Sequence, residues 1–276
     1  MSTNEIKQHG TDSLPFELYD IDNLHPIYHM VFHWHDQIEL IRILTGKLSL
    51  TLDRECYTLS EGSYAFVNPR TIHGAAPEDC VYQCVVFNAE FLKSKNSSIN
   101  AFIDRLVSHE IRVPDIIENE ELKGAARELF EAMESGEPFE IIGSAMRVFG
   151  KIRSGHVYEA STLEPDSENA QKLLRLQMVL RFIRAHYMED VSLEMLSDVA
   201  ELSPKYFCSF FRSMTGVTPI DYLVSYRIER ASRKLLESSD TVTKIALDCG
   251  FNDLSYFIKT FKAQKGVTPS GFRRRK

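Results

Sequence analysis

Apolar residues in the last hundred positions recur at helical spacing in two similar units. Aromatic residues of the first unit reappear fifty positions later in the second, as the pairs Tyr206/Tyr256, Phe207/Phe257 and Phe211/Phe261. Each unit ends in Gly-Val-Thr-Pro, where Gly suits the left-handed position after a helix and Thr-Pro favours a new helix start. The pattern predicts two helix-turn-helix units, at residues 192–214 and 241–264.

The second helix of each unit is predicted to have one apolar and one polar face. The polar residues of the first unit are Lys205, Cys208, Ser209 and Arg212. In the second unit Asn252 or Asp253 caps the helix, and its polar residues are Ser255, Lys259 and Lys262. One such face is equally typical of a solvated surface, but two similar units in tandem favour DNA binding. A long helix over Thr218–Leu236 would hold the units about one DNA turn, ~34 Å, apart.

The first half of the chain has the alternating pattern of short β-strands. Ile38–Leu44, Lys47–Leu52 and Tyr64–Val67 are rich in strand-forming residues, and Thr45-Gly46 and Glu61-Gly62 predict turns between strands. Several short strands at this spacing are typical of a sandwich or a barrel.

Histidines and one carboxylate mark a candidate site in this region. His33, His35 and Glu39 have the same parity, so on one strand they would share a face, and His73 follows in a later segment. Three imidazoles and a carboxylate are ligands suited to Zn, Fe, Mn or Ni. The alternative is that these side chains form hydrogen bonds in or near a pocket for a small polar effector.

Two amphipathic helices are predicted between the halves. Their apolar positions are Leu122, Ala126, Leu129, Phe130 and Met133 in the first, and Ile142, Ala145, Phe149 and Ile152 in the second. The second set has the spacing of a helix-pair seam, which favours packing on the barrel together with a dimer contact; the alternative is that both helices simply pack on the barrel. The polar residues 159–169 are predicted to be a linker.

Charge sharpens the division of the chain, because the acidic total of −7 conceals two opposite halves. Residues 170–276 hold 18 Lys and Arg against 11 Asp and Glu, a net charge of +7, whereas residues 1–169 have a net charge of −14. A basic module joined to an acidic one is typical of a phosphate-binding domain with a separate partner domain.

The remaining composition predicts a cytoplasmic protein without a membrane segment. The chain has no apolar run of 18 residues, its first ten residues are polar, and its five cysteines show no disulfide pattern. It also lacks the sequence motifs of phosphate-binding loops, dinucleotide sites and serine nucleophiles, which argues against those enzyme classes.

Residues 170–276 resemble the DNA-binding domain of AraC/XylS-family transcription regulators. The matching motifs include Leu202-Ser203-Pro204, Cys249-Gly250-Phe251 and both copies of Gly-Val-Thr-Pro. The resemblance implies that Lys205, Cys208 and Ser209 enter one major groove, and that Ser255 and Lys259 enter the next. Ser197 stands where the family usually has Ala, and Glu201 stands where Gly is common.

The histidine segment resembles the cupin superfamily. The spacing His33-x-His35-x3-Glu39-x6-Gly46 is similar to the first cupin motif, and Gly62 to His73 is similar to the second, with Arg70 where Gly is usual. The resemblance implies that these four residues would be metal ligands in a cupin enzyme, whereas in AraC-like regulators the region is the effector-binding barrel.

We therefore predict an α+β protein of two domains: a cupin-like β-barrel with flanking helices, then an all-α domain with two helix-turn-helix units. Residues 1–158 would bind the effector and dimerise, residues 159–169 would link the two domains, and residues 170–276 would bind DNA. The predicted function is sequence-specific transcription regulation, without catalysis, controlled by a small-molecule effector at His33, His35, Glu39 and His73. The alternatives are a metal-sensing regulator and a metal-dependent cupin enzyme. The expected partners are double-stranded DNA, the effector, a second copy of the chain and RNA polymerase.

Overall fold

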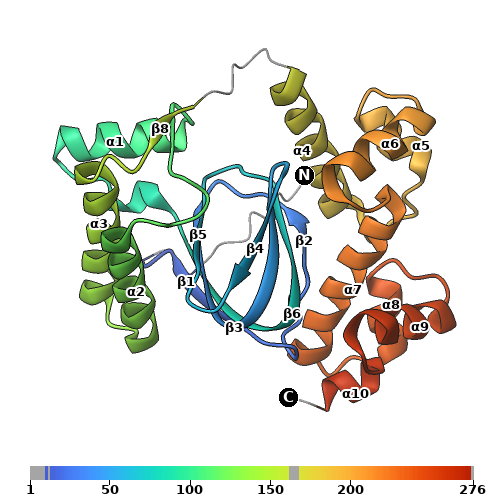
Figure 1. Ribbon diagram of the computed structural model, residues 1–276. Helices are drawn as coiled ribbons and strands as arrows, with labels where there is room; N and C mark the ends of the chain where they lie inside the picture. Colours follow the sequence, from blue (N-terminus) through green and yellow to red (C-terminus); the bar gives the residue numbers. More distant parts are fainter. Residues whose placement is uncertain (1–9, 12, 162–167, 275–276) are drawn as a thin grey trace. The chain divides into compact units, whose positions relative to one another are not determined.

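Two compact units make up the part of the chain that the computed structural model describes, residues 10–11, 13–161 and 168–274 (Figure 1). The first lies within Ile6–Ser167 and holds all the described strands, and the second lies within Glu168–Lys276 and is helical. The predicted fold class is therefore confirmed. Among the described helices, none combines the length and the apolar character that a membrane span requires.

A six-stranded antiparallel sheet forms the first unit. Its strands are β1 (Phe16–Ile21), β2 (Met30–His33), β3 (Ile38–Leu52), β4 (Glu55–Ser60), β5 (Tyr64–Val67) and β6 (His73–Phe87). The order is β1-β6-β3-β4, with β2 paired to β6 and β5 paired to β3, and the strands curl around a shared interior (Figure 1). One face packs an interior core that includes Leu50 and Tyr82, and the other packs Leu40 and Phe87 against helices. Both faces of the curled sheet are therefore buried, and the sheet forms a cupin-like barrel.

A bulge bends the long β3–β6 pair near its middle. The register of the pair shifts between Ile43 and Lys47, where Gly46 has φ +74°. A Cβ on Gly46 would lie 2.1 Å from the carbonyl oxygen of Asp79 on β6, so only glycine fits. The predicted turn at Thr45-Gly46 is therefore wrong, since this Gly forms a bulge within one continuous strand. The other predicted turn, at Glu61-Gly62, is present.

The bulge also changes which residues face the interior. Ile41 and Ile43, before the bulge, belong to the interior core, and so do Leu48 and Leu50, after it. Odd positions therefore face inward on one side of Gly46 and even positions on the other.

Helices cover the outer face of the barrel sheet. They are η1 (Ala89–Leu92), α1 (Ser97–Val107), α2 (Glu120–Ser135) and α3 (Pro138–Ser154). α2 and α3 form a hairpin closed by Gly136, which has φ +71°. A short ribbon completes the unit: β7 (Ile111–Arg112) pairs with β8 (Glu159–Ala160), the last element before the second unit.

The predicted apolar faces of α2 and α3 pack on the sheet. Leu122, Ala126, Leu129, Phe130, Ala145, Phe149 and Ile152 are all buried in the core, and Met133 and Ile142 pack partly against it. Packing on the barrel, which both interpretations share, is therefore confirmed, and the dimer contact stays a prediction.

Seven helices form the second unit as described. They are α4 (Glu168–His186), α5 (Leu193–Val199), α6 (Pro204–Thr215), α7 (Pro219–Glu237), α8 (Val242–Asp248), α9 (Leu254–Lys265) and α10 (Pro269–Arg273). The pairs α5–α6 and α8–α9 lie at the two predicted helix-turn-helix positions, and α7 joins them as one helix. Arg227 of α7 donates hydrogen bonds to the carbonyl oxygens of Tyr187 and Glu189, at 2.7 Å each, and so fixes α7 to the end of α4.

Helix ends in this unit follow the sequence signals. Gly216 and Gly266 end α6 and α9 in the left-handed region, and Thr218 and Thr268 cap the helices that follow. Asp253 rather than Asn252 caps α9, accepting hydrogen bonds from Ser255 and Tyr256. Both departures from family patterns are accommodated. The Ser197 hydroxyl donates to the carbonyl oxygen of Glu194 at 2.9 Å, and Glu201 takes the left-handed conformation for which Gly is the usual residue, with φ +55°.

The Gly46 bulge provides a stability test of the bend. Gly46→Ala should lower the free energy of unfolding by more than about 3 kcal/mol, because the new Cβ would collide with β6 backbone. Gly62→Ala is the matched control: Gly62 has φ +79° with nothing near its Cβ position, so the cost should be about 1–2 kcal/mol. Urea unfolding followed by fluorescence of Trp34, the one tryptophan of the chain, measures both. Equal costs would show that the bend tolerates a side chain.

Candidate functional site

Four predicted side chains converge inside the barrel. The ligand-type atoms of His33, His35, Glu39 and His73 all lie within 4.8 Å of one another. Nε2 of His35 and Nε2 of His73 lie 3.1 and 3.2 Å from the same oxygen, Oε2 of Glu39. The rings of His33 and His73 are 4.1 Å apart between centroids.

The route by which they converge differs from the predicted one. His33, His35 and Glu39 do not share one strand: His33 ends β2, His35 lies in the connection, and Glu39 lies on β3. His33 is brought to the site by pairing directly with His73 of β6. The backbone N–H of Arg70 donates to the carbonyl oxygen of His35 at 2.7 Å, with Arg70 at φ +58°, the left-handed region that explains the usual Gly there.

Backbone carbonyl groups orient all three imidazoles in the same way. Nδ1 of His33 lies 3.0 Å from the oxygen of Val31, Nδ1 of His35 lies 3.0 Å from that of Gln37, and Nδ1 of His73 lies 2.8 Å from that of Thr71. A carbonyl oxygen only accepts, so Nδ1 of each ring donates the proton, and Nε2 of each ring faces the cluster.

The charge state of the cluster is set by burial and by the imidazoles. Burial alone would raise the pKa of Glu39, but its contacts with His35 and His73 outweigh this effect and hold that pKa well below its usual range. Nε2 of His73 is fully buried and, although close to Glu39, makes no hydrogen bond with any described residue. A buried anionic oxygen beside convergent ring nitrogens is an arrangement suited to a cation or to a ligand with hydrogen-bond donors.

Two buried cysteines of β6, Cys80 and Cys84, do not form a disulfide. Cys84 lies beside Glu39, and burial, followed by that carboxylate, raises the pKa of its thiol well above the usual value. Cys80 and Cys84 lie on one continuous strand, four positions or ~13 Å apart, which is too far for a disulfide. The hydroxyl of Tyr82 donates to the carbonyl oxygen of Tyr28 at 3.0 Å.

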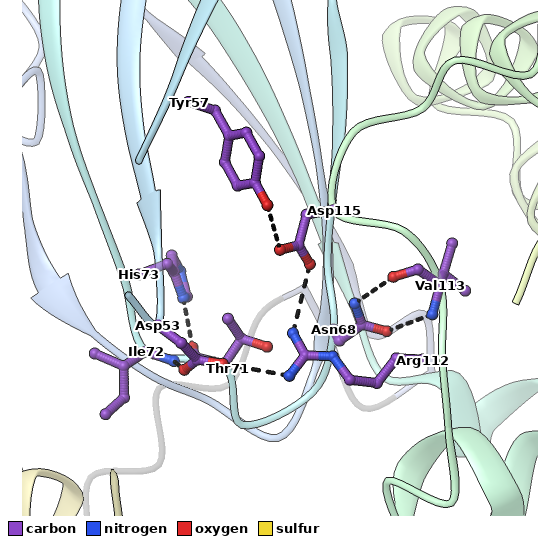
Figure 2. A network of polar contacts seen from close by, with 9 residues as sticks. All are labelled: Asp53, Tyr57, Asn68, Thr71, Ile72, His73, Arg112, Val113 and Asp115. Carbon is purple, nitrogen blue, oxygen red and sulfur yellow. Dashed lines mark hydrogen bonds and ion pairs between the residues drawn. The ribbon is translucent and has the colours of Figure 1, made fainter. Parts of the chain in front are cut away.

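A polar network that sequence reasoning missed adjoins the cluster (Figure 2). Arg112 of β7 pairs with Asp53 of the β3–β4 turn at 3.3 Å and with Asp115 at 3.4 Å. The hydroxyl of Tyr57 donates to the second oxygen of Asp115 at 3.2 Å. These residues are far apart in the sequence, and each by itself resembles an ordinary surface residue, so no local sequence pattern predicts the network.

The second unit exposes most of the predicted DNA-binding residues. Lys205, Ser209 and Arg212 on α6, and Ser255, Lys259 and Lys262 on α9, are exposed; Asn252 is exposed just before α9, and Cys208 is half-buried. Two further exposed residues are Tyr206 and Tyr256, at 55% and 50%, in the first turns of α6 and α9. Their position before the buried Phe207 and Phe257 in both repeats could have identified them.

Known protein families match both units. An AraC-like ligand binding domain matches residues 18–147, and a helix-turn-helix domain matches residues 196–275. The first range contains all four residues of the barrel cluster, and the second contains both predicted recognition helices.

Two curated relatives match nearly end to end. The uncharacterized HTH-type transcriptional regulator YdeC of Bacillus subtilis is 25% identical over 98% of this chain and 95% of its own length. The HTH-type transcriptional activator RhaS of Escherichia coli is 25% identical over 87% of this chain and 86% of its own length. Among solved structures, the DNA-binding domain of AdpA, in complex with a target DNA, is 31% identical over 37% of this chain and 91% of its own, with a TM-score of 0.36.

Proposed function

Because the chain belongs to the AraC family of transcription regulators, we propose that occupancy of the barrel cluster controls how its two recognition helices bind DNA. The protein is a DNA-binding regulator with a ligand-binding domain. The observation that carries the proposal is the convergence of four buried or partly buried polar side chains in the ligand-binding unit, three of them oriented by backbone carbonyl groups. We propose residues 1–158 for sensing and dimerisation, 159–169 as linker and 170–276 for DNA binding.

DNA contact is proposed for the outward faces of α6 and α9. The proposed residues are Lys205, Cys208, Ser209, Arg212, Asn252, Ser255, Lys259 and Lys262, to which we add Tyr206 and Tyr256 because their side chains are exposed. Lys259 is the proposed base reader, since a lysine can donate to O6 and N7 of guanine.

An organic effector is the first candidate ligand, and a divalent metal ion is the second. The metal candidate is supported by the three Nδ1 contacts with carbonyl oxygens, which are the outer-shell contacts expected of metal-binding histidines. His33, His35, Glu39 and His73 would hold Zn, Ni, Mn or Fe, and the ion would supply a fixed positive charge inside the barrel.

Catalysis is not part of the proposal. A metal-dependent cupin enzyme would use the same four residues, but the helical unit would have no role in it. As a regulator of transcription the protein is expected in the cytoplasm and in contact with RNA polymerase, which cell fractionation and pull-down with purified polymerase would test.

A homodimer is proposed through the outer face of α3. Phe139 is 87% exposed, and the exposed Gly143 and Gly150 continue the same face at helical spacing, with the partly buried Met146 between them. A Cβ at Gly143 or Gly150 would meet no described atom within 4 Å, so a neighbouring helix could approach closely there. This face differs from the apolar positions that the sequence suggested for a dimer contact, which pack wholly or partly in the core.

Lys259→Ala should weaken binding to a DNA duplex selected from a random library by about 1–3 kcal/mol and relax preference at one base pair. The reason is loss of a bidentate contact to guanine. Fluorescence anisotropy against the duplex and its single-base variants measures both effects, with Lys95→Ala, in the first unit, as control. A uniform loss on all duplexes would identify Lys259 as a phosphate contact instead.

Purified protein loaded with Zn, Ni, Mn or Fe should retain about one equivalent of one of these metals after gel filtration. His73→Ala should lower the affinity for that metal by more than about tenfold, because a ligand is lost, whereas the exposed control His156→Ala should not. Elemental analysis and competition with a chelator give the readout. If none of the four metals is retained by the wild type, the metal candidate is rejected and the organic effector stands alone.

Phe139→Ser should raise the dimer dissociation constant by about tenfold or more, because an exposed aromatic at an interface centre is a typical hot spot. Folding should be unaffected, since the side chain is exposed in the single chain. Sedimentation over a concentration series measures the constant, and Glu140→Ser is the neighbouring exposed control. A wild type that stays monomeric, or a variant as dimeric as the wild type, contradicts the proposed face.

A further inference from the structure

The segment that carries His73 is held by Asp53. The backbone N–H of Ile72 donates to Oδ1 of Asp53 at 3.0 Å, and the backbone N–H of Asp53 donates to the carbonyl oxygen of Ile72 at 2.7 Å. The neighbouring carbonyl group, of Thr71, is the one that orients the His73 ring. Asp53 therefore binds both backbone polar groups of Ile72, the residue before His73, and a displacement of His73 would act on these hydrogen bonds (Figure 2).

The second oxygen of Asp53 faces the β7–β8 ribbon. Oδ2 lies 3.3 Å from Nη1 of Arg112, and both side chains are largely buried, with 19% and 23% exposed. One carboxylate thus contacts the cluster segment through one oxygen and β7 through the other. Because a carboxylate is rigid and planar, it cannot shift to follow Ile72 without moving or breaking its contact with Arg112.

Arg112 belongs to the end of the first unit. It pairs with Glu159 of β8, and the backbone N–H of Ser161 donates to the carbonyl oxygen of Glu110 at 3.0 Å. The next described residue is Glu168, the first of α4 in the DNA-binding unit. The ribbon is therefore the described element of the ligand-binding unit that lies nearest along the chain to the second unit.

A second, uncharged attachment holds the same ribbon in place. The Asn68 side chain donates to the carbonyl oxygen of Val113 at 2.8 Å and accepts from its N–H at 3.0 Å. The backbone N–H of Phe66 also donates to the carbonyl oxygen of Asp115 at 2.8 Å. Loss of the Asp53–Arg112 contact alone would therefore leave the segment folded on β5.

We propose that Asp53 and Arg112 form a relay that couples occupancy of the His33, His35, Glu39 and His73 cluster to the β7–β8 ribbon. This inference rests on the proposed function of the cluster as the ligand site. A ligand that draws His73 toward the cluster centre would fix the backbone of Thr71–His73. The hydrogen bonds between Ile72 and Asp53 would then fix the Asp53 carboxylate, and its ion pair with Arg112 would hold the ribbon. Coupling of two such sites is a free energy shared between them, so a stabilised ribbon also favours the occupied cluster.

Amide hydrogen exchange on the full chain tests the relay, with Zn²⁺ as probe. Zn²⁺ should slow exchange of peptides covering 108–117 and 156–161 by about tenfold in the wild type, a typical coupling magnitude. Asp53→Asn keeps an acceptor for Ile72 and tolerates the φ of +52° at this position, but it places an amide against Arg112. It should still bind Zn²⁺, at most about tenfold more weakly than the wild type because the coupling is reciprocal, and lose the slowing. Arg112→Met should do the same.

The control is Arg105→Met, which breaks an exposed ion pair with Glu110 beside the same ribbon but does not touch Asp53. It should keep the slowing in full. The relay is overturned if Zn²⁺ binds the wild type without slowing the ribbon, or if Asp53→Asn slows as the wild type does.

A metal-free arm separates failure of the relay from failure of the metal candidate. His73→Ala should speed exchange of the 108–117 peptide in the wild-type background and add nothing in the Asp53→Asn background. Unchanged exchange in the β3–β6 peptides verifies folding. Absence of Zn²⁺ binding to the wild type rejects the metal candidate alone, and an additive effect of the two substitutions in this arm rejects the relay.

Discussion

The bend at Gly46 is the constraint on which the ligand site depends. Glu39 pairs with Val86, whereas His73 pairs with Leu52 at the opposite end of the β3–β6 ladder. A straight strand would separate residues 39 and 52 by ~40 Å, yet Glu39 and His73 lie 3.2 Å apart. The two halves of the ladder must therefore fold over each other, and the bulge, with no room for a side chain at Gly46, is where they do so.

Closure of the barrel in turn forms both the cluster and the contact between Asp53 and Arg112, through which we propose that ligand binding affects the ribbon. Backbone carbonyl groups orient the three rings, so the cluster is organised before any ligand arrives. The same closed geometry brings the β3–β4 turn beside β7, where Asp53 meets Arg112. Ligand site and ribbon are thus parts of one polar assembly, although they derive from segments far apart in the chain.

The helical unit was predictable in detail because its signals are local. Helix caps, the left-handed Gly positions and the spacing of buried Phe residues each depend on a few neighbouring residues, and the fifty-residue repeat doubles every signal. Membership of the cluster was also predictable from residue types and motif spacing. Its geometry was not, because His33 and Glu39 come from different strands, and the predicted turn at Thr45-Gly46 proved to be a bulge. The apolar faces of α2 and α3 were recognised, but periodicity cannot say which surface covers them.

The sequence by itself determined the two units, the positions of the described recognition helices and the four residues of the barrel cluster, since these follow from periodicity, caps and motif spacing. Only the tertiary structure decided that α2 and α3 pack on the sheet, that Phe139 stays exposed, and that Asp53, Arg112 and Asp115 meet. The physical reason is the range of the interactions. Helix signals act within a few residues, whereas barrel closure and ion pairing join positions separated by tens of residues, which no local sequence pattern identifies.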